Sequence, residues 1–348
     1  MSRQDKDKVL PNSKVLSVAF FYFICSISMN FLNKAIVSSY EFNYPFTIMA
    51  CQMVFTIILL DSLRISGFLK MHWFSLQDGI EFLPASLTFA LHSTLSLIAL
   101  HGMNIPMYGA MKRCCPLVSL ILSVTLLKKP RPSALLSSSI GIITLGAVLA
   151  ALGDLQFDQY AYSMGALSVF AQASYLTLVQ KSSEFNHKNT LEMIYINAYN
   201  TLPVFLTMAL VLGEPSKVAN SLLHEVASFY YVFLLLVVSG SVLTYSQFLC
   251  AAVCSALTTS MVGHCKSVIQ TVLGFYTFGG VKFHPLNIAG LVMNILGGVV
   301  YAYVKQMEGR RRERRMSKVE SGSRKESRTK SDVILCIEDE NRNRTRDI

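Results

Sequence analysis

Residues 255–278 read SALTTSMVGHCKSVIQTVLGFYTF and contain one charged side chain, that of Lys266, near the middle. A helix of about 20 residues crosses the roughly 30 Å hydrocarbon core of a bilayer, so this stretch is long enough to span it. A lysine at the centre of such a helix costs about 2.5–3.5 kcal/mol to insert, and it is retained where it faces a partner or water. The stretch therefore predicts both a membrane helix and a functional cation.

A second hydrophobic stretch has the same construction. Residues 104–127 read NIPMYGAMKRCCPLVSLILSVTLL and contain Lys112 and Arg113. Each lysine follows a glycine by three residues, in the segments GAMK and GHCK. Lys112 and Lys266 are 154 residues apart, which is close to half of the hydrophobic region. The repetition predicts a duplicated chain in which each half supplies one lysine.

The composition is that of a membrane protein. Of the 348 residues, 52% are hydrophobic and 15% are charged, whereas a typical soluble domain has about 25% charged residues. The mean hydropathy is +0.43. The net charge of +10 is concentrated in the C-terminal tail and in short loops, where basic residues set membrane topology and contact anionic lipid. We therefore expect membrane lipid, and no nucleic acid, as a partner.

Recurring hydrophobic stretches predict an all-α membrane protein of ten transmembrane helices, because backbone groups in hydrocarbon must be hydrogen-bonded within their own segment. The predicted helices are 15–37, 44–63, 82–101, 105–127, 134–152, 159–180, 191–212, 228–249, 251–278 and 285–304. Lysine and arginine predominate in the loops after even-numbered helices, which predicts that these loops and both termini are cytosolic. Residues 1–14 are predicted to form the cytosolic N-terminus before the ten-helix domain, 15–304.

The ten predicted helices divide into repeats of five, at about 15–152 and 159–304. An odd number of helices inserts the second repeat upside down, and in such inverted repeats the site lies near the midplane at the repeat interface. Lys112 and Lys266 both belong to the fourth helix of their repeat, so a pseudo-two-fold axis would bring them to one cavity. The tail, 305–348, is rich in charged residues and serine and contains no aromatic residue, so we expect it to be disordered.

The cations Lys112, Arg113 and Lys266 define a candidate anion site. Arginine can bind phosphate oxygens through two parallel hydrogen bonds, while lysine acts as a mobile point charge. An anion with two or more negative charges, such as a diphosphate, is the natural complement. The alternative is that these side chains extend to the membrane interface or pair with an acid, but the inner parts of the spans contain almost no Asp or Glu.

The seventh predicted helix, which includes EMIYINAYNTLPVF (192–205), gathers amides and tyrosines. Amides can bind the edge of a base or sugar hydroxyls, and tyrosine rings can stack on a base. The alternative role is hydrogen bonding between helices. The candidate contacts in this helix and its neighbours are Tyr195, Asn197, Tyr199, Asn200, Tyr108, Tyr245, Thr258, Thr259, Gly263 and Gln270. Asn33 and Lys34 are candidates for gating the site or anchoring the first helix at the interface.

No catalytic centre, metal site or cofactor is predicted. The sequence lacks HExxH, GxSxG, P-loop and GxGxxG motifs, and its eight cysteines form no CxxC pair. The cysteines are interpreted as small packing residues rather than metal ligands or disulfides. We therefore do not expect an enzyme.

Five segments carry a resemblance to a known family: FLNKAIVSSYEFNYP (31–45), NIPMYGAMKRCCPLV (104–118), GDLQFDQYAY (153–162), YINAYN (195–200) and SALTTSMVGHCKSVIQTVLG (255–274). They resemble nucleotide-sugar transporters of the solute-carrier group that includes triose-phosphate translocators, in the drug/metabolite transporter superfamily. The last segment is similar to a run in the UDP-sugar branch. The resemblance implies ten helices, a Golgi or endoplasmic-reticulum membrane, and exchange of a cytosolic UDP-sugar for a lumenal nucleoside monophosphate, UMP.

By this resemblance, Lys266 contacts the nucleotide phosphates, and Asn197 corresponds to an asparagine of the Phe-Tyr-Asn-Asn motif of GDP-sugar transporters. The chain keeps one of that motif's two asparagines, and Cys265 replaces the asparagine of their Gly-Ala-Leu-Asn-Lys motif. These departures favour uridine over guanine. Ser267 stands where the UDP-sugar branch usually has asparagine, which leaves the sugar open.

Two other functions remain as alternatives. One is exchange of phosphorylated metabolites, as in the triose-phosphate translocators. The other is a transport-inactive membrane adaptor that acts through the basic tail. The candidate partners are a nucleotide sugar, a nucleoside monophosphate, membrane lipid and a second copy of the chain.

Overall fold

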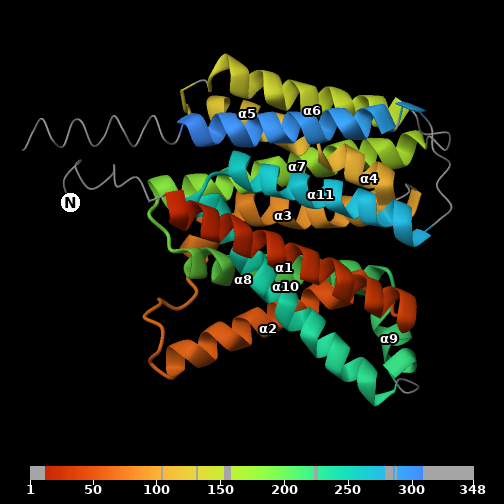
Figure 1. The fold of residues 1–348 in the computed structure, drawn as a ribbon. Helices are drawn as coiled ribbons and strands as arrows, with labels where there is room; N and C mark the ends of the chain where they lie inside the picture. Colours follow the sequence, from red (N-terminus) through yellow and green to blue (C-terminus); the bar gives the residue numbers. More distant parts are fainter. Residues whose placement is uncertain are drawn as a thin grey trace, which may run out of the picture. The chain divides into compact units, whose positions relative to one another are not determined.

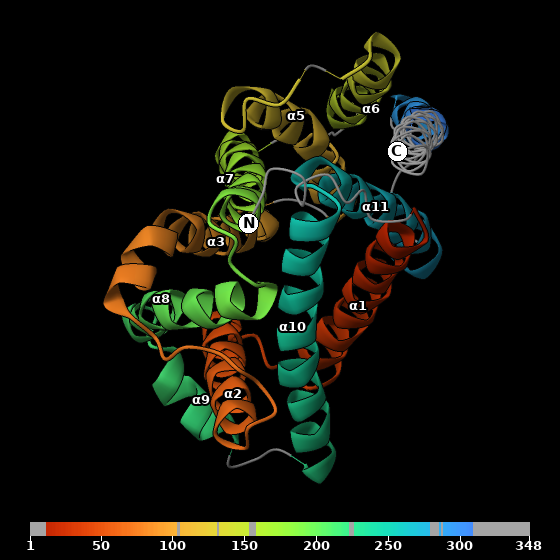
Figure 2. The same cartoon turned by 90° about the vertical axis from the view of Figure 1, so that its left-hand side faces the viewer.

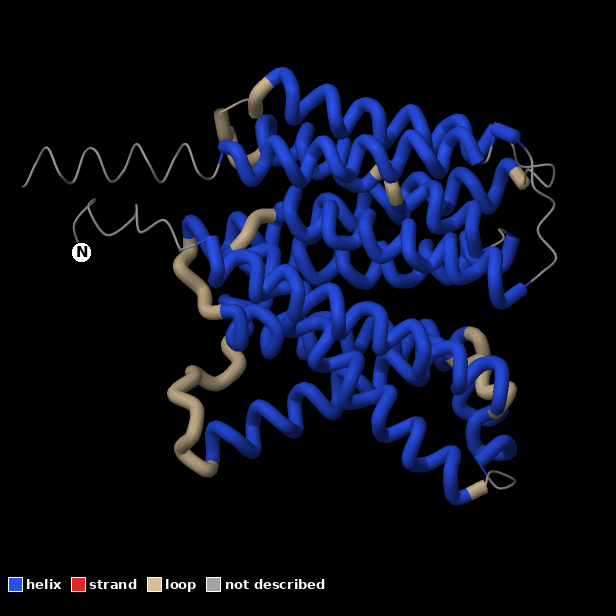
Figure 3. Tube along the Cα trace, in the orientation of Figure 1, coloured by secondary structure: helices blue, strands red, loops and turns tan. Residues whose placement is uncertain are grey.

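The computed structural model describes residues 12–308 apart from 103–104, 131, 153–157, 223–225, 279–284 and 287. Within these ranges the regular secondary structure is helical and contains no strand, as Figure 3 shows. The predicted all-α class is therefore confirmed. Most of the predicted N-terminal segment and all of the predicted tail beyond Glu308 lie outside the described residues.

The helices follow the hydrophobic stretches of the sequence (Figure 1). They are α1 (Asn12–Ser39), α2 (Pro45–Ile65), α3 (Leu76–Gly102), α4 (Ile105–Lys112), α5 (Cys115–Thr125), α6 (Ala134–Leu152), α7 (Gln159–Phe185), α8 (Thr190–Val211), α9 (Glu214–Leu222), α10 (Ala227–Val253) and α11 (Ala256–Phe278). A last helix covers Ile288–Glu308. In the described part of the chain, six helices are long and apolar enough to cross a membrane. The chain is thus a multi-pass membrane protein.

The prediction of one continuous helix over 105–127 is wrong, because the chain breaks between α4 and α5. The N–H groups of Arg113 and Cys114 donate to carbonyl groups only three residues back, those of Ala110 and Met111. Pro116 lies in the first turn of α5, and a proline there has no N–H with which to continue the α4 ladder. The break follows directly after Lys112.

The predicted start of the ninth helix at residue 251 is also wrong. Residues 251–253 belong to the end of α10, and α11 begins at Ala256. Between them, Ser255 has a φ of 139°. Residues other than glycine rarely adopt this backbone conformation, and it interrupts a helix. The N–H of Ala256 donates to Gln180 Oε1 at 2.8 Å, which fixes the start of α11 against α7.

The described helices pack as recognisable pairs within residues 1–298. Helix α3 lies along α7, and α1 lies along α10, as Figures 1 and 2 show from two directions. Helix α2 packs on α8, and α4 and α5 pack on α11. The main apolar core lies between α2, α3, α7, α8 and α10 and includes Phe89, Tyr175 and Phe248.

Two close approaches of backbone position the outer helices. A Cβ built on Gly290 would lie 2.5 Å from the carbonyl oxygen of Gly146, so α6 and the start of the last helix touch where only glycine fits. A Cβ on Gly240 of α10 would lie 2.2 Å from Gln52 Cδ of α2. The chain divides into units after Gly298, and the second unit, as far as it is described, is the end of the last helix.

The first turn of α2 is capped by an acid from far along the chain. Glu214, at the start of α9, is buried. The N–H and the hydroxyl of Thr47 both donate to Glu214 Oε2 at 2.7 Å, and the N–H of Phe46 donates to Oε1 at 3.4 Å. A carboxylate at a helix N-terminus satisfies otherwise unpaired N–H groups and complements the helix dipole. This contact fastens α2 to the α8–α9 junction.

Candidate functional site

Lys112, the last residue of α4, is surrounded by neutral polar groups. Its Nζ lies 2.9 Å from Ser168 Oγ, 3.1 Å from Gln172 Oε1, 3.2 Å from Ser96 Oγ and 3.3 Å from His92 Nδ1. An ammonium has three protons to donate. The four groups around it take the place of the water molecules that would otherwise accept these protons. The ion pairs found among the described residues all involve other cations. We call His92, Ser96, Ser168 and Gln172 the Lys112 cradle.

The cradle is built by two helices that pack along each other. His92 and Ser96 are four residues apart on α3, and Ser168 and Gln172 are four apart on α7, so each pair shares one helix face. Ser96 Oγ and Ser168 Oγ also hydrogen-bond to each other at 2.7 Å. No motif in the sequence singles out these residues. The signal that could have found them is two polar pairs at helical spacing inside apolar spans.

Tyr108, a candidate contact, lies beside Lys112. It is one helical turn earlier on α4, and Lys112 Nζ is 5.1 Å from the centroid of its ring. A cation at this distance over an aromatic face is attracted by the negative face of the ring. Tyr108 also packs against Ala161 and Tyr162 of α7. Tyr108 therefore belongs to the same site as Lys112.

Lys266 on α11 has a different environment. Its side chain is partly buried, and in the described part of the chain it makes no hydrogen bond and no ion pair with an acid. Helix α11 packs on α4, and Arg113, the residue after Lys112, donates to Ser267, the residue after Lys266, so the structure brings the segments that carry the two predicted lysines together. One turn earlier, a Cβ built on Gly263 would meet nothing within 4 Å. Lys266 is thus a cation next to open space on α11.

Arg113 points to another helix than its neighbour Lys112. It is buried, its Nε donates to Ser267 Oγ at 3.3 Å, and its Nη2 donates to the carbonyl oxygen of Ser267 at 3.4 Å. Ser267 follows Lys266 directly. The guanidinium therefore ties the α4–α5 break to α11 next to the second lysine.

The two asparagines predicted on α8 have opposite surroundings. Asn197 is fully buried, and neither Oδ1 nor Nδ2 has a hydrogen-bond partner within the described residues. Buried amides are normally paired, so such a group requires an explanation. Asn200 Nδ2, in contrast, donates to the Gly79 carbonyl oxygen at 2.9 Å and to Ser86 Oγ at 3.2 Å. Asn200 therefore links α8 to α3, which corresponds to the alternative role of hydrogen bonding between helices.

Tyr195 belongs to a charged cluster where α2 ends and α8 begins. Its hydroxyl donates to Asp61 Oδ1 at 2.8 Å and accepts from Arg64 Nη1 at 3.2 Å. Arg64 and Asp61 form an ion pair of 2.5 Å. Tyr199, one turn further on α8, stacks on Phe74 with ring centroids 4.6 Å apart. We call Asp61, Arg64, Tyr195 and Tyr199 the Arg64 cluster; none of its described contacts is with the Lys112 cradle.

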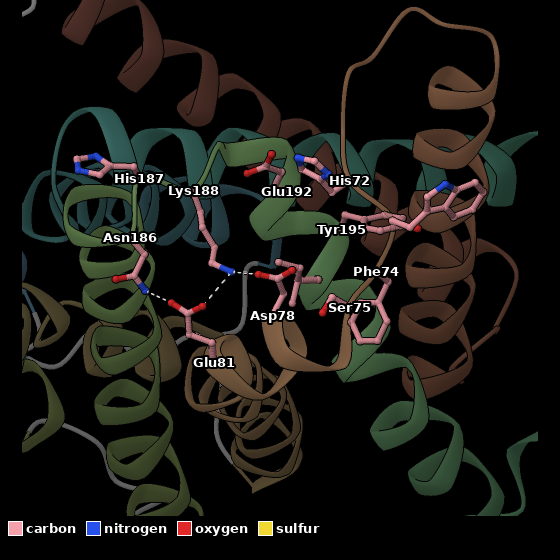
Figure 4. A pocket seen from close by; sticks show the side chains of 12 residues that line it. His72, Phe74, Ser75, Asp78, Glu81, Asn186, His187, Lys188, Glu192 and Tyr195 are labelled. Atoms are coloured by element: carbon pink, nitrogen blue, oxygen red, sulfur yellow. Dashed lines mark hydrogen bonds and ion pairs between the residues drawn. The ribbon is translucent and has the colours of Figure 1, made fainter. Parts of the chain in front are cut away.

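A hollow of about 330 Å³ lies next to this cluster, between the α2–α3 and α7–α8 connections (Figure 4). Lys188 reaches into it and forms ion pairs with Asp78 at 2.5 Å and Glu81 at 3.2 Å, while Asn186 donates to Glu81. Burial alone would lower the pKa of Lys188, but its hydrogen bonds and the two carboxylates raise it above its ordinary value. The hollow contains neither predicted lysine. With its cation already paired, it is not the predicted anion site.

No described contact links the remaining candidates to Lys112 or Lys266. Tyr245 packs against the main core. The hydroxyl of Thr259 is bonded to the Ser255 carbonyl oxygen at 2.9 Å. Asn33 is exposed on α1. The side chains of Lys34 and Gln270 lie outside what the structure describes. No group of His, Cys, Asp and Glu able to hold a metal occurs among the described residues.

Residues 13–302 match the Triose-phosphate Transporter family. The chain belongs to this family, whose members are membrane transporters. Among its relatives, the Arabidopsis thaliana UDP-galactose/UDP-glucose transporter 7 is 37% identical over 85% of this chain and 91% of that protein. A putative UDP-sugar transporter of Dictyostelium discoideum is 32% identical over 78% of this chain and 70% of its own length.

Two further comparisons concern a more distant relative and the fold. The Arabidopsis thaliana UDP-N-acetylglucosamine transporter UGNT1 is 29% identical over 82% of this chain and 87% of its length. One solved crystal structure is 12% identical, with a TM-score of 0.60, over 85% of this chain and 98% of that chain. At that identity the likeness concerns the fold alone.

Proposed function

We propose that the chain is an antiporter that imports a UDP-sugar from the cytosol into the lumen of the Golgi or endoplasmic reticulum in exchange for UMP. The observation that carries the proposal is that Lys112 and Lys266 directly precede Arg113 and Ser267, which hydrogen-bond to each other, while no ion pair among the described residues joins either lysine to an acid. Two such cations inside a membrane favour an anionic guest. Support for the class of guest comes from relatives named for UDP-sugars.

Each predicted residue takes a role from its surroundings. Lys266 binds phosphate directly, since no described group competes for its ammonium. Lys112, held by its cradle, supplies the second positive charge, and Tyr108 lines the same space. Asn197 offers an unpaired amide to the nucleoside or sugar. Arg113 holds α11 in place beside Lys266 through Ser267.

The proposal includes ten membrane helices in two inverted repeats, with both termini in the cytosol. Exchange of the repeats would replace α1 by α7, α2 by α8, α3 by α10, α4–α5 by α11, and α6 by the last helix. The α3–α7 and α1–α10 pairs are related by that exchange, and the α2–α8 and α5–α11 pairs are each mapped onto themselves. Gly146 and Gly290 join the fifth pair. This pattern of neighbours supports a pseudo-two-fold axis.

Antiport follows from the cost of the empty site. A cavity with two uncompensated cations is unfavourable to move through a low-dielectric barrier, whereas a bound nucleotide neutralises them. The loaded carrier therefore reorients more readily than the empty one. Because UMP and a UDP-sugar share uridine and phosphate, either can complete the return step.

The test is uptake by the purified protein in liposomes. Vesicles loaded with UMP should accumulate radiolabelled UDP-glucose or UDP-galactose, and vesicles without UMP should not. Lys266→Met should abolish uptake. Lys217→Met, at an exposed lysine of α9, is the matched control and should transport normally. Equal uptake by both variants would refute the assigned site.

The same vesicles separate the alternatives. If triose phosphate or phosphoenolpyruvate competes with uptake while UMP does not, the chain exchanges phosphorylated metabolites. If no labelled substrate enters and a cellular phenotype depends only on residues 307–348, the chain acts as an adaptor. Either result would replace the UDP-sugar proposal.

A further inference from the structure

The connection between α2 and α3, residues 66–75, carries large apolar side chains that nothing in the described chain covers. The side chains in and next to this connection that are at least two-thirds exposed are Ile65 (75%), Phe68 (81%), Trp73 (67%) and Leu76 (77%). A connection surrounded only by water would not be expected to expose so much apolar surface in one place.

These side chains continue the apolar surfaces of the two helices that they join. On α3, the exposed residues are spaced by three and four positions and form one stripe: Leu76, Ile80, Leu83, Leu87 and Leu91. On α2, exposed Val54 and Ile58 are four positions apart. In a membrane protein such stripes contact acyl chains. The stripes end at the connection, so its apolar side chains lie where the lipid-facing surface meets the aqueous phase.

The connection also carries the residue types that bind an interface. Tryptophan is enriched at headgroup level because its ring is apolar and its N–H is polar. Lys70, between Phe68 and Trp73, is exposed and forms none of the ion pairs found in the described chain. A lysine near an anionic membrane surface is attracted to the acidic headgroups. Apolar surface and an available cation together favour acidic phospholipid.

Arg64 packs against one face of the Trp73 ring and holds the ring in position. The Cζ atom of Arg64 lies 3.3 Å from the centroid of a Trp73 ring, and Arg64 Nη1 donates to the His72 carbonyl oxygen at 3.4 Å. Arg64 is itself bound by Asp61 and Tyr195. A guanidinium that stacks on one ring face while its edges donate hydrogen bonds fixes the orientation of that ring.

We propose that residues 65–76 form a binding surface for acidic phospholipids of the leaflet at which α2 ends, with Trp73 inserted at headgroup level and oriented by Arg64. In the proposed orientation this is the cytosolic leaflet. The surface is distinct from the lysine site and does not depend on which solute is carried.

The chain provides its own probe, because Trp73 is its one tryptophan. In proteoliposomes, phosphatidylcholine brominated near the headgroup end of an acyl chain should remove about half or more of the emission, as expected for a residue at the interface. Aqueous iodide should have little effect. Quenching by iodide but not by brominated lipid would place Trp73 in water and overturn the proposal. Protection from both quenchers would mean that protein, such as a second copy, covers the surface, and would also overturn it.

Two variants test the individual contacts. When the bromine is carried by phosphatidylserine instead of phosphatidylcholine, the wild type should be quenched more strongly. Lys70→Gln should lose this difference, while Lys217→Gln should keep it. Arg64→Lys keeps the charge but not the planar stack, so emission should shift to longer wavelength and iodide quenching should increase. Wild-type behaviour of the Lys70 variant overturns the acidic-lipid assignment, and wild-type behaviour of the Arg64 variant overturns the orienting role of Arg64.

Discussion

The two halves of the chain each contribute one lysine to the candidate site, and the two lysines differ in their surroundings. Lys112 is held by four neutral polar side chains from α3 and α7. Lys266 has no described hydrogen-bond partner and lies one turn from the open space at Gly263. If the two halves are repeats, as proposed, the charge is kept while its environment diverges. One cation is hydrogen-bonded by the protein, and the other has no described partner.

The first prediction concerns the lysine without partners and has the largest expected effect. Lys266→Met should weaken UMP binding by about a hundredfold or more, since losing one member of a buried charge pair costs about 2–5 kcal/mol. The same change should raise the thermal midpoint of the empty protein, because it removes a desolvated charge. Calorimetric titration and thermal unfolding measure the two effects. A lowered midpoint would contradict the described environment of Lys266.

The second prediction concerns Lys112, where the same substitution should lower the stability of the empty protein instead of raising it. Lys112→Met should also weaken binding, but it leaves Gln172 Oε1 without its described donor. Leaving buried polar groups unsatisfied costs about 1–3 kcal/mol, so the thermal midpoint of the empty protein should fall. If both lysine variants shift the midpoint in the same direction, the contrast between the two sites is wrong.

The third prediction applies the same contrast to the amides of α8. Asn197→Leu should lower nucleotide affinity and leave the stability of the empty protein unchanged or increased, because no hydrogen bond is lost. Asn200→Leu removes two hydrogen bonds and should destabilise by about 1–3 kcal/mol. Thermal unfolding with and without UMP separates the two. Equal destabilisation would show that Asn197 is a structural amide.

The smallest effect is expected at a cation that is already neutralised. Lys188→Gln should lower the free energy of unfolding by less than about 1 kcal/mol, since ion pairs at partly exposed positions contribute little. Because the pKa of Lys188 is raised, the stabilisation is fully present at neutral pH and is lost only as pH rises above the ordinary lysine value of about 10.4. Unfolding midpoints of variant and wild type should therefore differ by a constant amount between about pH 6 and 9. A difference that vanishes within this range would contradict the ion pair.

The sequence predicted the helices well because apolar length alone determines them in a bilayer. It also singled out Lys112 and Lys266 as candidates, because an isolated charge within a span is informative by itself, and their role as a binding site stays a prediction. It did not predict the break after Lys112, since Pro116 is compatible with either a kink or a new helix start. It could not predict the Lys112 cradle, because that cluster exists only once α3 and α7 pack along each other.

Tyr195 is a candidate whose contacts likewise could not be predicted from the sequence. Its position among amides on α8 favoured a ligand contact, yet in the structure its hydroxyl binds Asp61 and Arg64. Both of these residues are more than 130 positions away in the chain. Such partners depend on how α2 and α8 meet and leave no trace in local sequence. Asn197 and Asn200 look alike in the sequence for the same reason and differ only in the packed structure.

The two ends of helix α2 are attached to the rest of the protein in different ways, and Glu214 holds only the first turn. At Thr47 the attachment includes main-chain N–H groups, which cannot be released by rotating a side chain of α2. At Arg64 and Asp61 the attachments to Tyr195 run through side chains alone. A rocking motion of α2 would therefore pivot about its Glu214 end and swing widest where Arg64 lies.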